Sequence, residues 1–239
     1  MAQPSIHEGQ SLPVIQQQRV IIRNKYGEKL VGVLHETGSA ELVILCHGYR
    51  CSKENKTFKN LAAALEEEGI SVFRFDFAGN GESEGSFQYG NYRREAEDLH
   101  AVVLHFSEAK RLISAILGHS KGGNVVLLYA STYSDVHTVI NASGRFNLER
   151  GNESHLGTDF LQRIRIDGII DVKDDTVTSF IRTQFSLVYS TNWIFSPVVA
   201  MQPLRQINGP SLSGSILFSD FFKILKLGII NFLRANAAS

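Results

Sequence analysis

The sequence predicts an α/β protein built on a doubly wound, mostly parallel β-sheet. Short apolar runs alternate along residues 19–144 with segments whose apolar side chains repeat at helical spacing. One run, residues 42–46, is apolar throughout, which is typical of a strand buried on both faces of a parallel sheet. The 239 residues are 43% hydrophobic, enough for one soluble domain with such a core.

The individual elements follow from local patterns, taken in chain order. Two β-rich runs around a Lys-Tyr-Gly turn predict a hairpin over residues 19–35. An amphipathic helix is expected at 58–68, because Leu61, Ala62 and Leu65 share one stripe and Gly69 follows its end. The same criteria predict strands at 41–48, 70–79, 112–118 and 137–143, and helices at 92–106 and 122–132.

The pattern changes beyond residue 144. We divide the chain into a disordered leader, 1–14, a core with the start of a cap, 15–175, and a divergent tail, 176–239. The tail shows no clean continuation of the alternation, so the sheet is expected to be incomplete at its C-terminal edge, with the strand at 138–142 exposed. Residues 216–234 predict an amphipathic helix that covers this edge, lies on a membrane surface or mediates self-association.

Composition narrows the classes of function. Lys plus Arg and Asp plus Glu both number 24, and no basic block occurs, which argues against a nucleic-acid partner and favours a small-molecule substrate. No cofactor and no metal site are expected. Cys46 and Cys51 are expected to be reduced thiols, and the N-terminal residues lack the pattern of a secretory signal, so we expect a cytoplasmic protein.

Residues 118–122, Gly-His-Ser-Lys-Gly, match the G-x-S-x-G pattern of a nucleophile elbow. The pentapeptide lies between a predicted strand and a predicted helix, where such a turn presents its serine. Side chains at Gly118 or Gly122 would collide with neighbouring elements, and Ser120 should have a positive φ. The alternative is a Gly/Ser turn that merely connects the two elements.

Three motifs in order support the first interpretation. CHGYR at 46–50, FRFDFAGNGESEG at 73–85 and GHSKGG at 118–123 resemble the α/β-hydrolase superfamily over residues 20–144. They are most similar to its serine-aminopeptidase-like, monoacylglycerol-lipase-like esterase branch. The resemblance implies that Ser120 is the nucleophile and that the backbone N–H groups of Tyr49 and Lys121 form the oxyanion hole. It implies loop-supporting roles for His47, Gly48, Asp76, Gly118 and Gly122, and it places Gly79, Gly81 and Ser83 in the loop that Asp76 braces.

The rest of a catalytic triad is not identifiable. In this superfamily the acid and then the histidine follow the serine, yet only His137 and His155 follow Ser120, and neither lies where the base is expected. No predicted strand presents an acid; the candidates are Asp171, Asp174, Asp175 and Asp220. The other histidines considered, His47, His100, His105 and His119, are expected to have structural or surface roles. Because losing a triad member costs about 10⁴- to 10⁶-fold in kcat, a weak or inactive hydrolase is predicted.

Two functional hypotheses remain. The first is a serine hydrolase acting on carboxylic esters or thioesters, an activity of the family that this chain retains poorly. The second is a non-catalytic binding protein of the same fold, or a truncated product of splicing or of a gene model. The Lys121 side chain also has two interpretations, because it could point into solvent or contact an anionic substrate; a cation at this helix start opposes the helix dipole.

Overall fold

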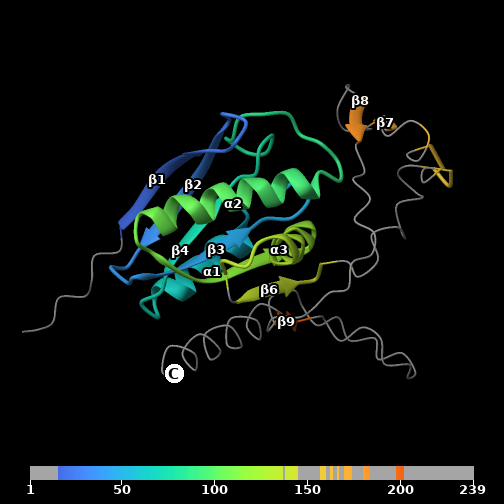
Figure 1. Cartoon of the computed structure of the whole chain (residues 1–239). Coiled ribbons are helices and arrows are strands. Elements are labelled where there is room, and N and C mark those ends of the chain that lie inside the picture. The colour runs from blue at the N-terminus through green and yellow to red at the C-terminus, as the bar shows by residue number, and fades with distance from the viewer. Residues whose placement is uncertain are drawn as a thin grey trace, which may run out of the picture.

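A computed structural model of the chain describes residues 16–136 and 138–144, then 157–159, 162, 163, 166 and three short strands further on. Seven strands form one mixed sheet in the order β1-β2-β4-β3-β5-β6-β9 (Figure 1). Their bounds are β1 Gln16–Arg23, β2 Lys29–Glu36, β3 Glu41–Cys46, β4 Ser71–Phe75, β5 Leu112–His119, β6 Val139–Ala142 and β9 Val198–Met201. β1, β2 and β4 pair in antiparallel fashion, whereas the pairs from β4 through β9 are parallel. The predicted mostly parallel sheet is confirmed.

The N-terminal hairpin is held by its turn. β1 and β2 pair in a single register from Gln16 opposite Glu36 to Arg23 opposite Lys29. The Asn24 side chain accepts hydrogen bonds from the backbone N–H groups of Tyr26 and Glu28, each at 3.0 Å. This local bonding is the usual reason for asparagine in tight turns, and the hairpin predicted at 19–35 is confirmed.

Helices cover both faces of the sheet. Their bounds are α1 Lys56–Glu66, α2 Tyr92–Glu108 and α3 Lys121–Thr132. Alternate residues of β3 face opposite sides: Leu42, Ile44 and Cys46 join the core under α2 and α3, whereas Val43 and Leu45 join the core under α1 (Figure 1). All of these side chains are fully buried, and each large one contributes about 1.5 to 3 kcal/mol to stability. The doubly wound arrangement expected from the alternation is therefore present.

A capping side chain and a glycine set the two ends of α1. α1 starts two residues earlier than predicted because the Asn55 side chain caps it, accepting the Thr57 N–H at 2.9 Å. Gly69, with φ +75°, reverses the chain after its last turn. α2 and α3 match their predicted ranges to within two residues.

The expectation that β6 forms an exposed edge is wrong. β9 pairs with β6 in parallel, from Val139 opposite Val198 to Ala142 opposite Met201. β9 has only four residues, between Pro197 and Pro203, so it is too short to show a strand pattern in the sequence. The leader 1–14 and the amphipathic segment 216–234 lie outside the described residues.

Two further strands, β7 Ile170–Lys173 and β8 Phe180–Thr183, form a separate antiparallel pair. They span the point at which the core was predicted to give way to the tail. Among the helices that the structure describes, none is both long enough and apolar enough to span a bilayer.

Candidate active site

Ser120 lies at the junction of β5 and α3 with φ +54° and ψ −118°. The predicted positive φ is confirmed, in a region that L-residues rarely occupy without a compensating reason. Its backbone N–H donates to the Ala142 carbonyl at 2.8 Å, which ties the turn to the end of β6. A serine at a helix start usually accepts an N–H of the first turn, but this side chain does not cap α3. Its hydroxyl is thus not used to hold the helix.

Close backbone packing explains the two flanking glycines. A Cβ on Gly118 would lie 2.0 Å from the Gly122 carbonyl oxygen, and a Cβ on Gly122 would lie 2.2 Å from the Cys46 carbonyl oxygen. Both distances are far below van der Waals contact, and the opposing atoms are backbone atoms that cannot rotate away. The turn that carries Ser120 therefore joins β5 to α3 with the two elements in close contact, and it packs against the end of β3.

The loop after β3 approaches Ser120 from the other side. A Cβ on Gly48 would lie 3.3 Å from the Ser120 Cβ and 3.2 Å from the His119 carbonyl oxygen. Tyr49 follows in this loop with 39% of its surface exposed. The histidine-glycine motif and the serine motif, far apart in sequence, thus meet where β3 and β5 end.

His47 is buried and engaged on both ring nitrogens. Nε2 lies 3.1 Å from the backbone nitrogen of Phe77, and Nδ1 lies 2.9 Å from the Gly48 carbonyl oxygen. Since the Phe77 N–H can only donate, Nε2 is the acceptor and the proton sits on Nδ1. Burial lowers the pKa of His47 to about 4, which keeps the ring neutral. The ring joins the loop after β3 to the loop after β4.

Asp76 connects the same two loops through a buried carboxylate. It accepts the Lys53 N–H at 2.6 Å, the Lys53 ammonium at 2.7 Å and the Glu82 N–H at 3.0 Å. A Cβ on Gly81 would meet an Asp76 carboxylate oxygen at 2.2 Å, so only glycine fits there. Sequence reasoning missed Lys53, because a lysine within CSKENK resembles an ordinary exposed loop residue.

Lys121 does not point into solvent, so that interpretation of its side chain is wrong. The side chain is 7% exposed, and its ammonium lies 2.5 Å from a carboxylate oxygen of Glu95 in the first turn of α2. Burial raises the pKa of Glu95. Since the ammonium already has a carboxylate partner, the structure favours an internal role over capture of an anionic substrate. Sequence reasoning also missed Glu95, whose only signal was an acidic residue near a helix start.

The described histidines other than His47 contact other parts of the fold. His35 lies 2.6 Å from Glu66 and accepts from Arg74 at 2.8 Å, and the His100 ring stacks on Tyr133 with centroids 3.8 Å apart. The His105 ring contacts Phe106, and the His119 ring packs edge-on against Phe58 of α1. The remaining triad candidates lie outside the described residues, namely His137, His155, Asp174, Asp175 and Asp220; of Asp171 only the backbone in β7 is described.

Three aromatic rings gather beside the histidine-glycine loop. The Tyr49 ring lies 5.7 Å from the ring of Phe87 and 5.2 Å from that of Tyr89, between centroids. Edge-on and tilted pairs of this kind add to the stability that burial provides. They fix the loop that follows β4 against the loop that carries Tyr49.

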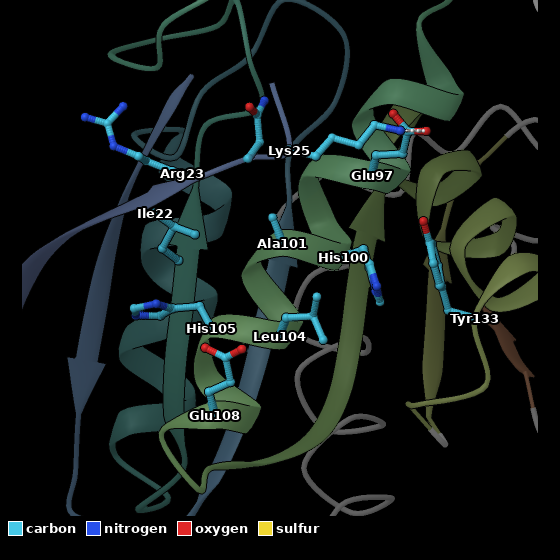
Figure 2. Close-up of a pocket in the computed structure, with 11 residues that line it drawn as sticks. Ile22, Arg23, Lys25, Glu97, His100, Ala101, Leu104, His105, Glu108 and Tyr133 are labelled. Carbon is cyan, nitrogen blue, oxygen red and sulfur yellow. Dashed lines mark ion pairs between the residues drawn. The ribbon is translucent and has the colours of Figure 1, made fainter. Parts of the chain in front are cut away.

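A cavity of about 370 Å³ lies elsewhere, on the outer side of α2 (Figure 2). It is lined by α2 residues such as His100 and Leu104, by the β1–β2 turn and by Tyr133. Lys25 and Glu97 form an ion pair across its rim. Ser120 is not among its lining residues. Over the described ranges, no cluster of three or more His, Cys, Asp or Glu side chains could hold a metal ion, and Cys46 and Cys51 are free thiols.

Comparisons with known proteins agree with this geometry. The family described as serine aminopeptidase, S33, matches residues 38–166. The chain is 30% identical over 115 residues to protein phosphatase methylesterase 1 of Candida albicans, an alignment of 47% of this chain and 31% of that protein. It is 27% identical over 111 residues to a monoacylglycerol lipase of Mycolicibacterium smegmatis, covering 46% and 39%. The matched segment is thus well under half the length of either relative.

Solved structures show the same fold. An esterase of Pyrococcus furiosus superposes with a TM-score of 0.54 at 24% identity, covering 63% of this chain and 60% of that one. Est1E from Butyrivibrio proteoclasticus, with ferulic acid bound, superposes with a TM-score of 0.56 at 22% identity, covering 70% and 67%. The family match and these superpositions establish the fold that the three sequence motifs predict.

Proposed function

The chain belongs to the serine aminopeptidase S33 family of the α/β-hydrolase superfamily, and we propose that it carries the nucleophile and the oxyanion hole of a serine esterase. Ser120 is the nucleophile, and the backbone N–H groups of Tyr49 and Lys121 bind the oxyanion. The substrates are carboxylic esters or thioesters of small or medium acyl groups. The observation that carries the proposal is the positive φ of Ser120 at the start of α3, with Gly48 beside it.

In the proposed reaction, Ser120 Oγ attacks the acyl carbon while its proton passes to a base. The carbonyl electrons move to oxygen, which accepts hydrogen bonds from the two backbone N–H groups. The electrons then return, the C–O or C–S bond breaks, and the alcohol or thiol leaves with the proton. Water hydrolyses the acyl-serine by the same steps. The first N–H groups of a helix have no partner within the helix, which suits Lys121 as a donor.

The weak point of this reaction is the base that must accept the proton of Ser120. The ring nitrogens of His47 are engaged by Gly48 and Phe77, and His119 packs against Phe58. An oxyanion hole without a complete triad retains only about 10³- to 10⁴-fold acceleration over water. We therefore infer that the 239-residue chain turns over esters at least about 10⁴-fold more slowly than a complete serine esterase.

Two measurements on the intact chain test the proposal. Phenylboronic acid forms a tetrahedral adduct with a suitably placed serine hydroxyl, which ¹¹B NMR detects as an upfield shift. The adduct should form with the wild type, disappear in Ser120→Ala and persist in Ser114→Ala, which changes a half-buried serine of β5. An adduct equally strong in Ser120→Ala would disprove the assignment of the nucleophile.

Hydrolysis of 4-nitrophenyl acetate and butyrate tests the catalytic rate. Turnover should stay close to background and fall further in Ser120→Ala. A rate equal to that of complete serine esterases, abolished by Ser120→Ala, would show that a base is in place. The non-catalytic alternative is favoured by the engagement of the described histidines elsewhere. It predicts that an ester is bound with the same affinity by the wild type and by Ser120→Ala, with neither adduct nor turnover.

A further inference from the structure

The backbone and the side chain of Lys121 lie in different environments. Its backbone N–H belongs to the first turn of α3, next to Ser120, and its side chain runs back into the protein. There the ammonium meets Glu95 of α2 at 2.5 Å, with side chains only 7% and 5% exposed. The rings of Phe87 and Tyr92 each lie 5.8 Å from the same nitrogen. The ammonium therefore lies near two aromatic rings in a buried site, where an electrostatic contact is stronger than in water.

A buried ion pair is weak evidence for a gain in stability. A cation at the start of α3 opposes the helix dipole, and the desolvation of two buried charges can exceed their mutual attraction. One carboxylate oxygen of Glu95, Oε2, is buried and has no hydrogen-bond partner among the described groups. An apolar pair of similar volume would fill the same space without these costs. What the charged pair adds is a fixed direction for the Lys121 side chain.

The direction matters because the first turn of α3 is also held by the end of β3. Gly122 packs so closely on the end of β3 that an added Cβ would lie 2.2 Å from the Cys46 carbonyl oxygen and 2.5 Å from that of His47. The Glu95 contact holds the preceding residue from the side of α2. Contacts from two different elements therefore hold Lys121 and Gly122, the two residues that directly follow Ser120.

We propose that Glu95 is a positioning residue: by holding the Lys121 ammonium, it orients the Lys121 backbone N–H toward the oxyanion formed at Ser120. The inference rests on the proposed function, since it assigns a means of alignment to one donor of that oxyanion hole. Because Nζ is bound to Glu95, Lys121 does not serve as the base for Ser120. The contribution is geometric, and donors aligned in advance act without reorganising during the reaction.

The test compares phenylboronic acid affinity with folding stability in matched variants. The double variant Glu95→Leu/Lys121→Met replaces the ion pair by apolar side chains of similar size. Its urea unfolding should equal or exceed that of the wild type, while its boronate Kd should weaken by about tenfold or more. Lys121→Arg keeps the charge and should restore most of the affinity that Lys121→Met loses. Glu97→Gln, on the same helix but paired with Lys25 at the surface, should change neither quantity.

A double variant that binds phenylboronic acid as tightly as the wild type would overturn the inference, because the pair would then be packing alone. If the wild type forms no adduct that depends on Ser120, the proposed function is disproved, and boronate affinity no longer tests the role of Glu95. The pair is then judged by the ¹H–¹⁵N chemical shift of the Lys121 amide. In Glu95→Gln, which keeps Lys121, an unchanged shift overturns the positioning role, and a displaced resonance in a stably folded protein supports it.

Discussion

Replacing His47 by glutamine should change how the stability of the fold depends on pH. His47 is buried with a pKa of about 4, against an ordinary value of 6.5. The native state therefore binds the proton less tightly than the unfolded chain. The stabilisation by neutral His47 is complete above pH 6.5 and is lost as the pH falls toward 4. Shifts of this size correspond to about 3 kcal/mol in full and to about 2 kcal/mol between pH 7 and pH 5.

Asp98 changes the pH dependence of folding stability in the opposite sense to His47. Burial raises its pKa from 3.8 to about 6, although it accepts hydrogen bonds from Ala78 and Asn24. Here the native state takes up the proton first, so stability is lost as the pH rises through 6 and recovered on acidification. The recovery between pH 7 and pH 5 is about 1 kcal/mol. In the wild type the two groups therefore partly cancel.

Urea unfolding of the wild type and His47→Gln at about pH 7 and pH 5 isolates the histidine, because groups common to both proteins cancel in the difference. The stability advantage of the wild type should shrink by about 2 kcal/mol on acidification. Asp98→Asn serves as the control with opposite sign, since it should lose stability relative to the wild type over the same range. A difference between the wild type and His47→Gln that does not change with pH would refute the buried, neutral state of His47.

Two further substitutions test the packing around the site by urea unfolding. Gly122→Ala should destabilise the fold by about 1 to 3 kcal/mol, because the new Cβ meets backbone at 2.2 Å; Gly38→Ala, in open space with φ +81°, should cost only about 1 kcal/mol. An equal cost for both would contradict the close approach. Lys53→Met should cost about 3 to 5 kcal/mol, because it leaves the buried Asp76 carboxylate without its cation. A loss under 1 kcal/mol would show that water or another group replaces the ammonium.

The sequence alone determined the order of elements and the serine turn. Strand and helix periodicities are local, so the alternation from β1 through β6 could be predicted to within a few residues. The serine turn is also local. Gly118 and Gly122 are required by the backbone contacts of a strand that turns directly into a helix, and the positive φ of Ser120 follows from the same turn.

Only the tertiary structure decided which polar groups meet. Lys53 and Asp76 are 23 positions apart, and Glu95 and Lys121 are 26 apart, yet each pair forms a buried ion pair. A local pattern cannot predict them, because an isolated lysine or glutamate looks the same whether it is solvated or buried. The pairing of β9 with β6 likewise depends on strand order in the sheet. Residue periodicity reports which face of an element is apolar, whereas the partner across the fold is set by how whole elements pack.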